Sequence, residues 1–236
     1  MSSEIITRIM IMILALSTFS LAAQDLSVGA NMFSHKKTAY VTKKDGTSLE
    51  GTVDKIKRKK GLLEMVVLEV DGHEIELMPE EIDHMYLPPS GLDKLANKMD
   101  EATTMTKWDR EDVASDKIKE GYVYFENAQV SLKGNSQTLL MQLLNPGFSS
   151  KLRVYFDPLA NETSRANIGG LTVAGGLDKS YYVQRPGEEA YKLKKKDYRK
   201  DFENFYKDCP KVLKKYPKPD WPDFAKHIFY YSENCE

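Results

Sequence analysis

The chain has 236 residues, of which 41% are hydrophobic and 29% charged, and its 34 Lys and Arg against 35 Asp and Glu leave a formal net charge of -1. This composition excludes collagens, coiled coils, disordered tails and disulfide-dense mini-proteins. A nearly neutral chain also lacks the basic excess of most nucleic-acid binders, so we expect no nucleic acid among its partners.

The first residues have the pattern of a secretory leader. An apolar run at 9–21 follows a basic residue and leads into Ala22, Ala23 and Gln24. This order is typical of a cleaved signal peptide, and the run is shorter than the roughly 20 residues that span a bilayer. We expect removal of residues 1–23 and a periplasmic or secreted mature chain, with an uncleaved amphipathic anchor as the alternative.

The region 36–88 is predicted to form a small β-barrel. Turn signals recur about every eight to ten residues and separate five short strands, with one helical turn at 79–82. The expected strands are 38–42, 49–56, 62–70, 73–78 and 84–87. The stretch from Ala39 to Val53 resembles the first strands of SH3-like and Sm-like barrels, and this resemblance implies a closed barrel without free edges. The second Sm-type signature is missing, so no RNA-binding residues follow from it.

The region 90–120 is predicted to connect two domains. Apolar residues at three- and four-residue spacing, among them Leu92, Leu95 and Met99, indicate a helix over 90–105. The polar stretch 106–120 is interpreted as a linker with few apolar anchors.

The region 121–236 is predicted to be a second, antiparallel β-rich domain that ends in two helices. The expected strands are 122–132, 138–144, 152–156, 171–174, 181–185 and 190–193. The run 138–144 is almost wholly apolar, which indicates a central strand buried on both faces. The predicted fold class is therefore α+β, mainly β.

The two cysteines are expected to join the C-terminal helices. Cys209 extends an apolar stripe that ends in Phe205, and Pro210 is expected to end that helix; Cys235 extends a second stripe that contains Tyr231. In an oxidising compartment a pair of cysteines without CxxC spacing is typical of a disulfide, which for a loop of this length stabilises by about 3 kcal/mol. Two free reactive thiols or a metal-binding pair are the alternatives.

Catalytic motifs are missing from the sequence. It has no nucleophile elbow, P-loop, calcium loop or zinc-ligand spacing, and its four histidines lack partners at metal-ligand spacing. We therefore expect no cofactor and no metal, and we interpret His73 and His84 as surface residues beside acidic neighbours. The glycine pairs at 169–170 and 175–176 are interpreted as bends in a sheet, with a binding loop as the alternative.

Aromatic residues beside cations are the candidate ligand-binding residues. Tyr181 and Tyr182 are followed by Arg185, and Tyr155 follows Arg153. Exposed ring faces next to cations can bind glycans or peptides. We select Tyr155, Tyr181, Tyr182 and Arg185, although half-buried strand residues give the same pattern.

Charge is unevenly distributed along the chain. Residues 191–236 contain 11 Lys and 1 Arg against 8 Asp and Glu, a net charge of +4, which leaves -5 on the remainder. The densest run contains Lys192, Lys194, Lys195 and Lys196. This run of lysines predicts weak contact with an anionic membrane surface. The alternative is that the lysines only form a solvated face of the protein.

A second resemblance extends over about 121–210. The series that includes 139–148, 154–158 and 173–182 is similar to uncharacterised exported proteins of Bacteroidota. The resemblance implies a bacterial envelope location and no particular activity. We expect a non-enzymatic binding or scaffolding module whose partner is an envelope protein, peptide or glycan. The alternative is a periplasmic or secreted hydrolase with a dispersed site near Asp157 and Asp178.

Overall fold

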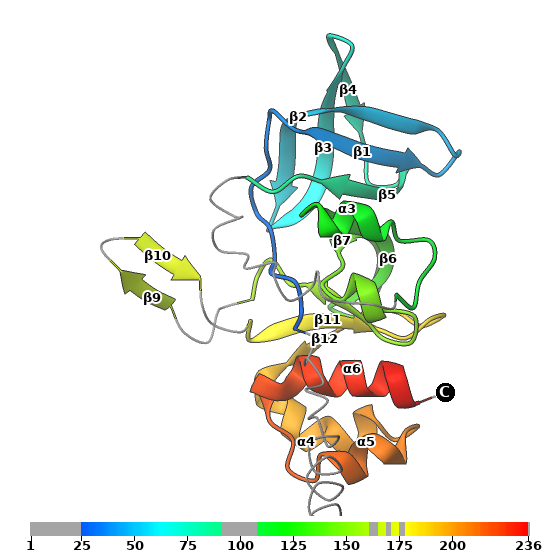
Figure 1. Ribbon diagram of the computed structural model, residues 1–236, viewed down its shortest axis with the longest axis vertical. Helices are drawn as coiled ribbons and strands as arrows, with labels where there is room; N and C mark the ends of the chain where they lie inside the picture. The colour runs from blue at the N-terminus through cyan, green and yellow to red at the C-terminus, as the bar shows by residue number, and fades with distance from the viewer. Residues whose placement is uncertain (1–24, 91–107, 161–164, 169–170, 175–177, 236) are drawn as a thin grey trace, which may run out of the picture.

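The computed structural model describes residues 25–90, 108–160, 165–168, 171–174 and 178–235. The predicted leader, nearly all of the predicted helix at 90–105 and both glycine pairs lie outside the described residues. The described part is mainly β with helices near the C-terminus, which confirms the α+β class. Figure 1 shows a large sheet at the top, a smaller sheet below it and the C-terminal helices at the bottom.

The large sheet has seven antiparallel strands in the order β4-β3-β2-β1-β5-β6-β7. Their bounds are β1 Thr38–Lys43, β2 Ser48–Lys59, β3 Leu62–Val70, β4 His73–Leu77, β5 Ile82–Leu87, β6 Val123–Leu132 and β7 Asn135–Gln142. The turn between β3 and β4 has two residues, Asp71 and Gly72, both at positive φ. Such a turn matches the twist of the two strands and fixes their register.

The expectation of a closed five-stranded barrel is wrong. In the described residues β4 pairs only with β3, and β5 pairs with β6 instead of closing on β4. Strands β1 to β5 do curve around one apolar core, which contains Leu68, Ile82 and Met85, and β6 and β7 add Phe125 and Leu140 to it. The sheet therefore runs on from 36–88 into the later strands, and the division into domains stays a prediction. The expected helical turn at 79–82 is a hydrogen-bonded turn.

Strand β7 is the last strand of the large sheet and not a central one, as its apolar run had predicted. Both of its faces are nevertheless covered, because Leu140 packs into the core of the first strands and Met141 packs on the opposite side. Just past β7, Leu143 pairs with Tyr155 and so connects the large sheet to the small one.

The small sheet has three antiparallel strands in the order β12-β11-β8. Their bounds are β8 Arg153–Phe156, β11 Ser180–Gln184 and β12 Tyr191–Lys194, close to the predicted strands. A separate hairpin of β9 Arg165–Ile168 and β10 Leu171–Ala174 pairs only with itself in the described residues and projects to one side (Figure 1).

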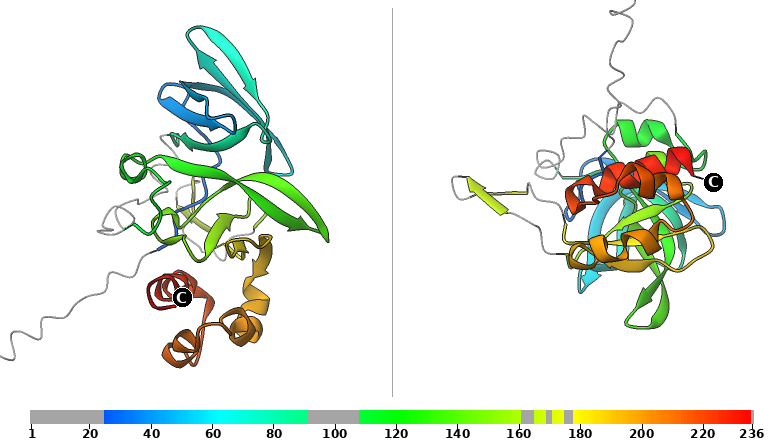
Figure 2. Two further views of the ribbon diagram at one scale, coloured as in Figure 1. Left: turned by 90° about the vertical axis from the view of Figure 1, so that its right-hand side faces the viewer. Right: turned by 90° about the horizontal axis from the view of Figure 1, so that it is seen from below.

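Three helices follow the small sheet, where two had been expected. The helices of the described residues are α3 Ser115–Lys119 before β6, and α4 Lys195–Phe205, α5 Pro210–Lys215 and α6 Phe224–Asn234 after β12, with 3-10 turns at η2 Pro146–Phe148 and η3 Trp221–Asp223. Pro210 begins α5 instead of ending α4, because a proline fits the first turn of a helix without losing a hydrogen bond. Figure 2 shows the helices packed beneath the small sheet. No helix among the described residues combines the length and the apolar character needed to cross a bilayer.

The disulfide between Cys209 and Cys235 is confirmed, with a Cα–Cα distance of 5.7 Å. Cys209 lies just before α5 and Cys235 just after α6, and both are buried. The bond therefore joins the start of one helix to the end of another within the core that the helices share with the small sheet. It is typical of proteins of oxidising compartments.

An N-terminal strap, residues 26–34, lies across both sheets. The Ser27 N–H donates to the Leu144 carbonyl at 2.7 Å. The buried Gln142 amide donates to the Val28 carbonyl at 2.9 Å and accepts from the Ala30 N–H at 2.8 Å. Polar backbone that crosses an apolar core needs such partners, so Gln142 fixes the path of the strap.

His227 lies among aromatic rings between the helices. Its Nδ1 is 2.8 Å from the Tyr198 hydroxyl, and the Tyr216 ring packs on it at a centroid distance of 4.3 Å. Burial lowers the pKa of His227 to about 4.

Stability is expected to depend on this histidine in mild acid. As pH falls from about 6.5 to about 4, the unfolded chain takes up a proton on His227 that the folded chain excludes. We expect this to lower the free energy of unfolding by about 3 kcal/mol across that range. Urea unfolding of the wild type and His227→Gln at pH 7 and pH 4 measures the difference. Equal losses in both proteins would contradict the prediction.

Candidate functional site

The predicted ligand-binding residues do not form one surface. Tyr155, Tyr181 and Tyr182 are buried, with exposed fractions of 0%, 4% and 4%. Tyr182 and Tyr155 are partners in the β8–β11 register and lie on the face toward the large sheet. Tyr181 points the other way and stacks on Trp221. Arg185 lies past β11. The role of these residues in ligand binding stays a prediction.

The side chain of Arg185 binds residues of the C-terminal helical region. Its guanidinium forms an ion pair with Asp208 at 3.4 Å, donates to the Phe205 carbonyl and lies 5.7 Å from the Tyr231 ring centre. Burial alone would lower the pKa of Arg185, but Asp208 outweighs it and the pKa lies above its usual value. Arg185 thus holds the C-terminal helices to the small sheet.

A buried ion-pair network lies between the two sheets, centred on Glu126 of β6. Arg110 donates to both carboxylate oxygens, at 3.2 Å to Oε1 and 2.8 Å to Oε2. The Tyr155 hydroxyl donates to Oε1 at 2.9 Å, and the Tyr124 hydroxyl lies 3.4 Å from Oε2. Arg153 is 3.7 Å from Oε1. The Tyr155 hydroxyl is also 2.9 Å from Gln184 Oε1, so its one proton is shared between two acceptors. Arg110 is therefore the partner that binds both oxygens of the carboxylate.

Arg110 and Asp112 hold each other in their ionised forms. Burial would lower the pKa of Arg110, but hydrogen bonds to Asp112 and Glu126 raise it above its usual value. The hydrogen bond from Arg110 lowers the pKa of Asp112. Burial, and then the charge of Glu126, raises the pKa of Tyr155. A buried network of this kind fixes the geometry of the contact between the two sheets.

Sequence reasoning missed Glu126 and Arg110. Glu126 interrupts the apolar face of β6 on which Tyr124 and Ala128 are buried, and an acidic residue at that position was a usable signal. Arg110 lies in the stretch interpreted as a polar linker, where nothing local separates a buried arginine from a solvated one.

Asp157 forms a second buried cluster. It accepts hydrogen bonds from Lys192 Nζ at 2.7 Å and the Ser180 hydroxyl at 2.6 Å. Asp178, the other carboxylate of the expected hydrolase, accepts through its backbone carbonyl from Trp221 Nε1 at 2.8 Å. The ion pair with Asp157 holds Lys192 against the small sheet, whereas residues 194–196 are exposed. Membrane contact through these lysines stays a prediction.

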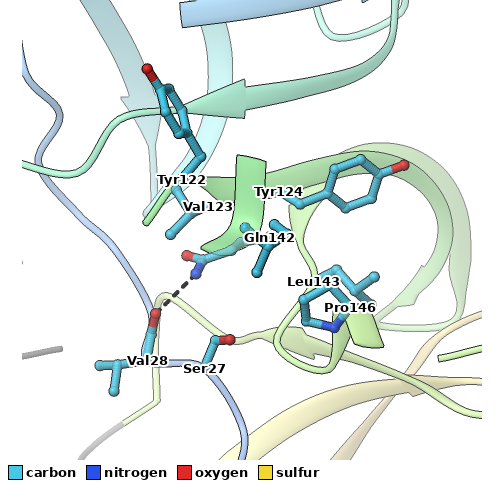
Figure 3. Close-up of a pocket in the computed structure, with 9 residues that line it drawn as sticks. Ser27, Val28, Tyr122, Val123, Tyr124, Gln142, Leu143 and Pro146 are labelled. Carbon is cyan, nitrogen blue, oxygen red and sulfur yellow. Dashed lines mark hydrogen bonds between the residues drawn. The ribbon is translucent and has the colours of Figure 1, made fainter. Parts of the chain in front are cut away.

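A hollow beneath the N-terminal strap is shown in Figure 3. Val28, Tyr122, Gln142 and Pro146 lie around it, and the dashed line marks the bond from Gln142 to Val28. It has room for a water molecule but not for an organic ligand. Among the described residues no group of His, Cys, Asp and Glu side chains has the arrangement of a metal site.

Comparison of the chain with protein-family models, with curated proteins and with solved structures gives no match.

The outer edge of β4 is the remaining candidate site. The two-residue turn pairs Val70 with His73, so the N–H of His73 points toward Val70 of β3. Along an antiparallel strand, the N–H and C=O groups of successive residues point alternately toward and away from the neighbouring strand. The backbone groups of His73, Ile75 and Leu77 therefore point toward β3. Those of Glu74 and Glu76 point outward, away from β3, where no other described strand pairs with β4. β4 lies at the top of Figure 1.

Proposed function

We propose that this protein is an exported, non-enzymatic binding module of the bacterial cell envelope that holds an extended polypeptide segment against the edge of β4. The observation that carries the proposal is the unpaired edge, with the outward N–H and C=O groups of Glu74 and Glu76 exposed in the described structure. Extended peptides bind proteins by adding a strand to such an edge.

The edge is supported by a rigid base. Leu77 of β4 is buried, and Leu68 of the adjacent β3 is in the same core. A partner strand would therefore meet a backbone that packing already holds extended, which lowers the entropic cost of binding.

Export and the envelope location rest on other features. They are supported by the leader pattern at 1–23, by the similarity of 121–210 to exported Bacteroidota proteins and by the buried disulfide. Glycan binding has less support, because the predicted tyrosines are buried. Membrane contact has less support because one of its four lysines, Lys192, is paired with Asp157.

A hydrolase is the second candidate. The cluster of Ser180, Lys192 and Asp157 favours it, since a serine beside a lysine can act as a nucleophile. In this arrangement, however, the serine hydroxyl and the lysine both donate to the carboxylate. Loss of an esterase or amidase activity in Ser180→Ala, with unchanged thermal stability, would favour the hydrolase.

A proline scan of the edge tests the binding proposal. Proline is tolerated where a strand N–H points to solvent and disrupts a ladder where it points inward. Short peptides in which valine alternates with Lys, Thr or Glu serve as probes, and hydrogen exchange of the Glu74 and Glu76 amides is the readout. We expect at least one probe to protect these amides, and Glu76→Pro to abolish its binding without unfolding the protein.

Ile75→Pro is the matched control, because it removes a hydrogen bond of the β3–β4 ladder and should destabilise the hairpin. If no probe protects the two amides, or if Glu76→Pro binds as well as the wild type, the proposed edge site is overturned.

A further inference from the structure

We infer that the segment bound at β4 is basic, with Lys or Arg at two alternate positions. This inference rests on the proposed function, and it follows from three glutamates next to the open edge. Glu74 and Glu76 lie two residues apart on β4, so their side chains project from the same face of the sheet. Glu69 of β3 is opposite Glu74 in the register. All three are exposed.

The charges of these glutamates are not balanced inside the protein. Among the described residues, no Lys, Arg or His lies within ion-pair distance of Glu69, Glu74 or Glu76. Some other glutamates are paired, for example Glu64 of β3 with Lys59 at 3.3 Å and Glu81, just before β5, with Lys43 at 3.8 Å, whereas Glu50 of β2 has no ion pair within the described residues. Within the described residues, the three glutamates beside the edge are therefore available to pair with a cation on an added strand.

The pair of Glu69 and Glu74 opposes formation of the hairpin. Like charges directly opposite on neighbouring strands are destabilising. The fold gains nothing from this pair, because neither side chain contributes to the core. A cation on an added strand beside β4 would lie next to Glu74 and reduce the repulsion.

The same charges disfavour a second copy of the chain as the occupant. Two β4 strands that pair antiparallel about Ile75 would place Glu74 of each copy opposite Glu76 of the other. Both cross-strand pairs would then repel, and charged edge strands prevent self-association in this way. A strand with Lys or Arg opposite Glu74 and Glu76 instead forms two attractive pairs.

The pairing register therefore determines which positions of the partner strand carry the basic side chains. The outward backbone groups belong to Glu74 and Glu76, so the residues that hydrogen-bond to them are also two apart. Their side chains project on the same face as the glutamates, within reach of an ion pair. The occupant is an extended polypeptide whose alternate side chains are basic.

Binding of the Lys, Thr and Glu probes to the wild type and to Glu74→Lys/Glu76→Lys tests the inference. We expect the wild type to bind the Lys probe about tenfold more tightly than the Glu probe at low salt, with a smaller ratio at high salt. The double variant should reverse the preference. Glu203→Lys/Glu233→Lys is the control, because it changes the net charge equally on the exposed side of α4 and α6, and it should keep the wild-type order.

The outcomes separate the two proposals. Equal binding of all three probes, with Glu74 and Glu76 protected, overturns the charge rule and leaves the edge site standing. No protection by any probe overturns the proposed function itself. A wild-type dimer in sedimentation that Glu76→Pro abolishes would show that a second copy is the occupant, and would also contradict the inference.

Discussion

Replacement of Glu126 by Leu is expected to lower the free energy of unfolding by about 3–5 kcal/mol, the range for breaking a buried ion pair on one side. The variant removes one of the two carboxylate partners of Arg110, whose side chain is only 7% exposed, and leaves Asp112 as the other. The Tyr155 hydroxyl, on the other sheet, loses its carboxylate acceptor. Urea unfolding, with the midpoint and the slope fitted separately, measures the loss.

Two further variants show whether the partly unbalanced charge of Arg110 or the lost contact between the sheets causes the loss of stability in Glu126→Leu. Arg110→Met/Glu126→Leu removes both charges and should recover part of the stability, because no uncompensated charge remains in the interior. Asp112 also pairs with Arg110, but its side chain is 65% exposed. We therefore expect Asp112→Asn to lower the free energy of unfolding by less than about 1 kcal/mol. A loss below about 1 kcal/mol for Glu126→Leu alone would contradict the structural role of the network.

Cys209→Ala/Cys235→Ala is expected to lower the free energy of unfolding by about 3 kcal/mol, because the unfolded chain regains the freedom of the loop that the disulfide closes. The sequence separation of the two cysteines is 26 residues. The loop includes all of α5 and α6, so the loss should appear first in the helical layer. Thermal unfolding followed by near-ultraviolet circular dichroism of the aromatic cluster measures it.

Reduction of the wild type provides an independent check. Dithiothreitol should lower the melting temperature of the wild type and leave that of the double variant unchanged. Identical melting temperatures for the oxidised and reduced wild type would contradict the stabilising role of the disulfide.

Local signals explain the parts of the fold that could be predicted. The bounds 62–70 predicted for a strand are those of β3, because a two-residue Asp-Gly turn marks its end. The stripes that end near Cys209 and Cys235 are buried, and the disulfide they predicted is present. In these cases the residues that decide the structure are neighbours in sequence.

Contacts between distant segments explain what was missed. The pairing of β5 with β6 joins strands separated by residues 88–122 and leaves no local signature. From the sequence alone, a closed barrel is therefore the predicted way to avoid free strand edges. Tyr155 and Tyr182 were expected at a surface, because alternation cannot show that both faces of a sheet are covered. The outward direction of Glu74 and Glu76 needed the strand order, which is a property of the whole sheet.

The N-terminal strap has a consequence for how the chain reaches its fold. Its hydrogen bond from Ala30 to Gln142 joins residues 112 positions apart, and that between Ser232 and Asp109 joins residues 123 apart. Chains with many such distant contacts fold slowly, because long loops must close before the contacts form. The strap cannot dock until residues 142–144 have been synthesised. Docking of the strap is therefore a late event, because the residues that hold it lie past the middle of the chain.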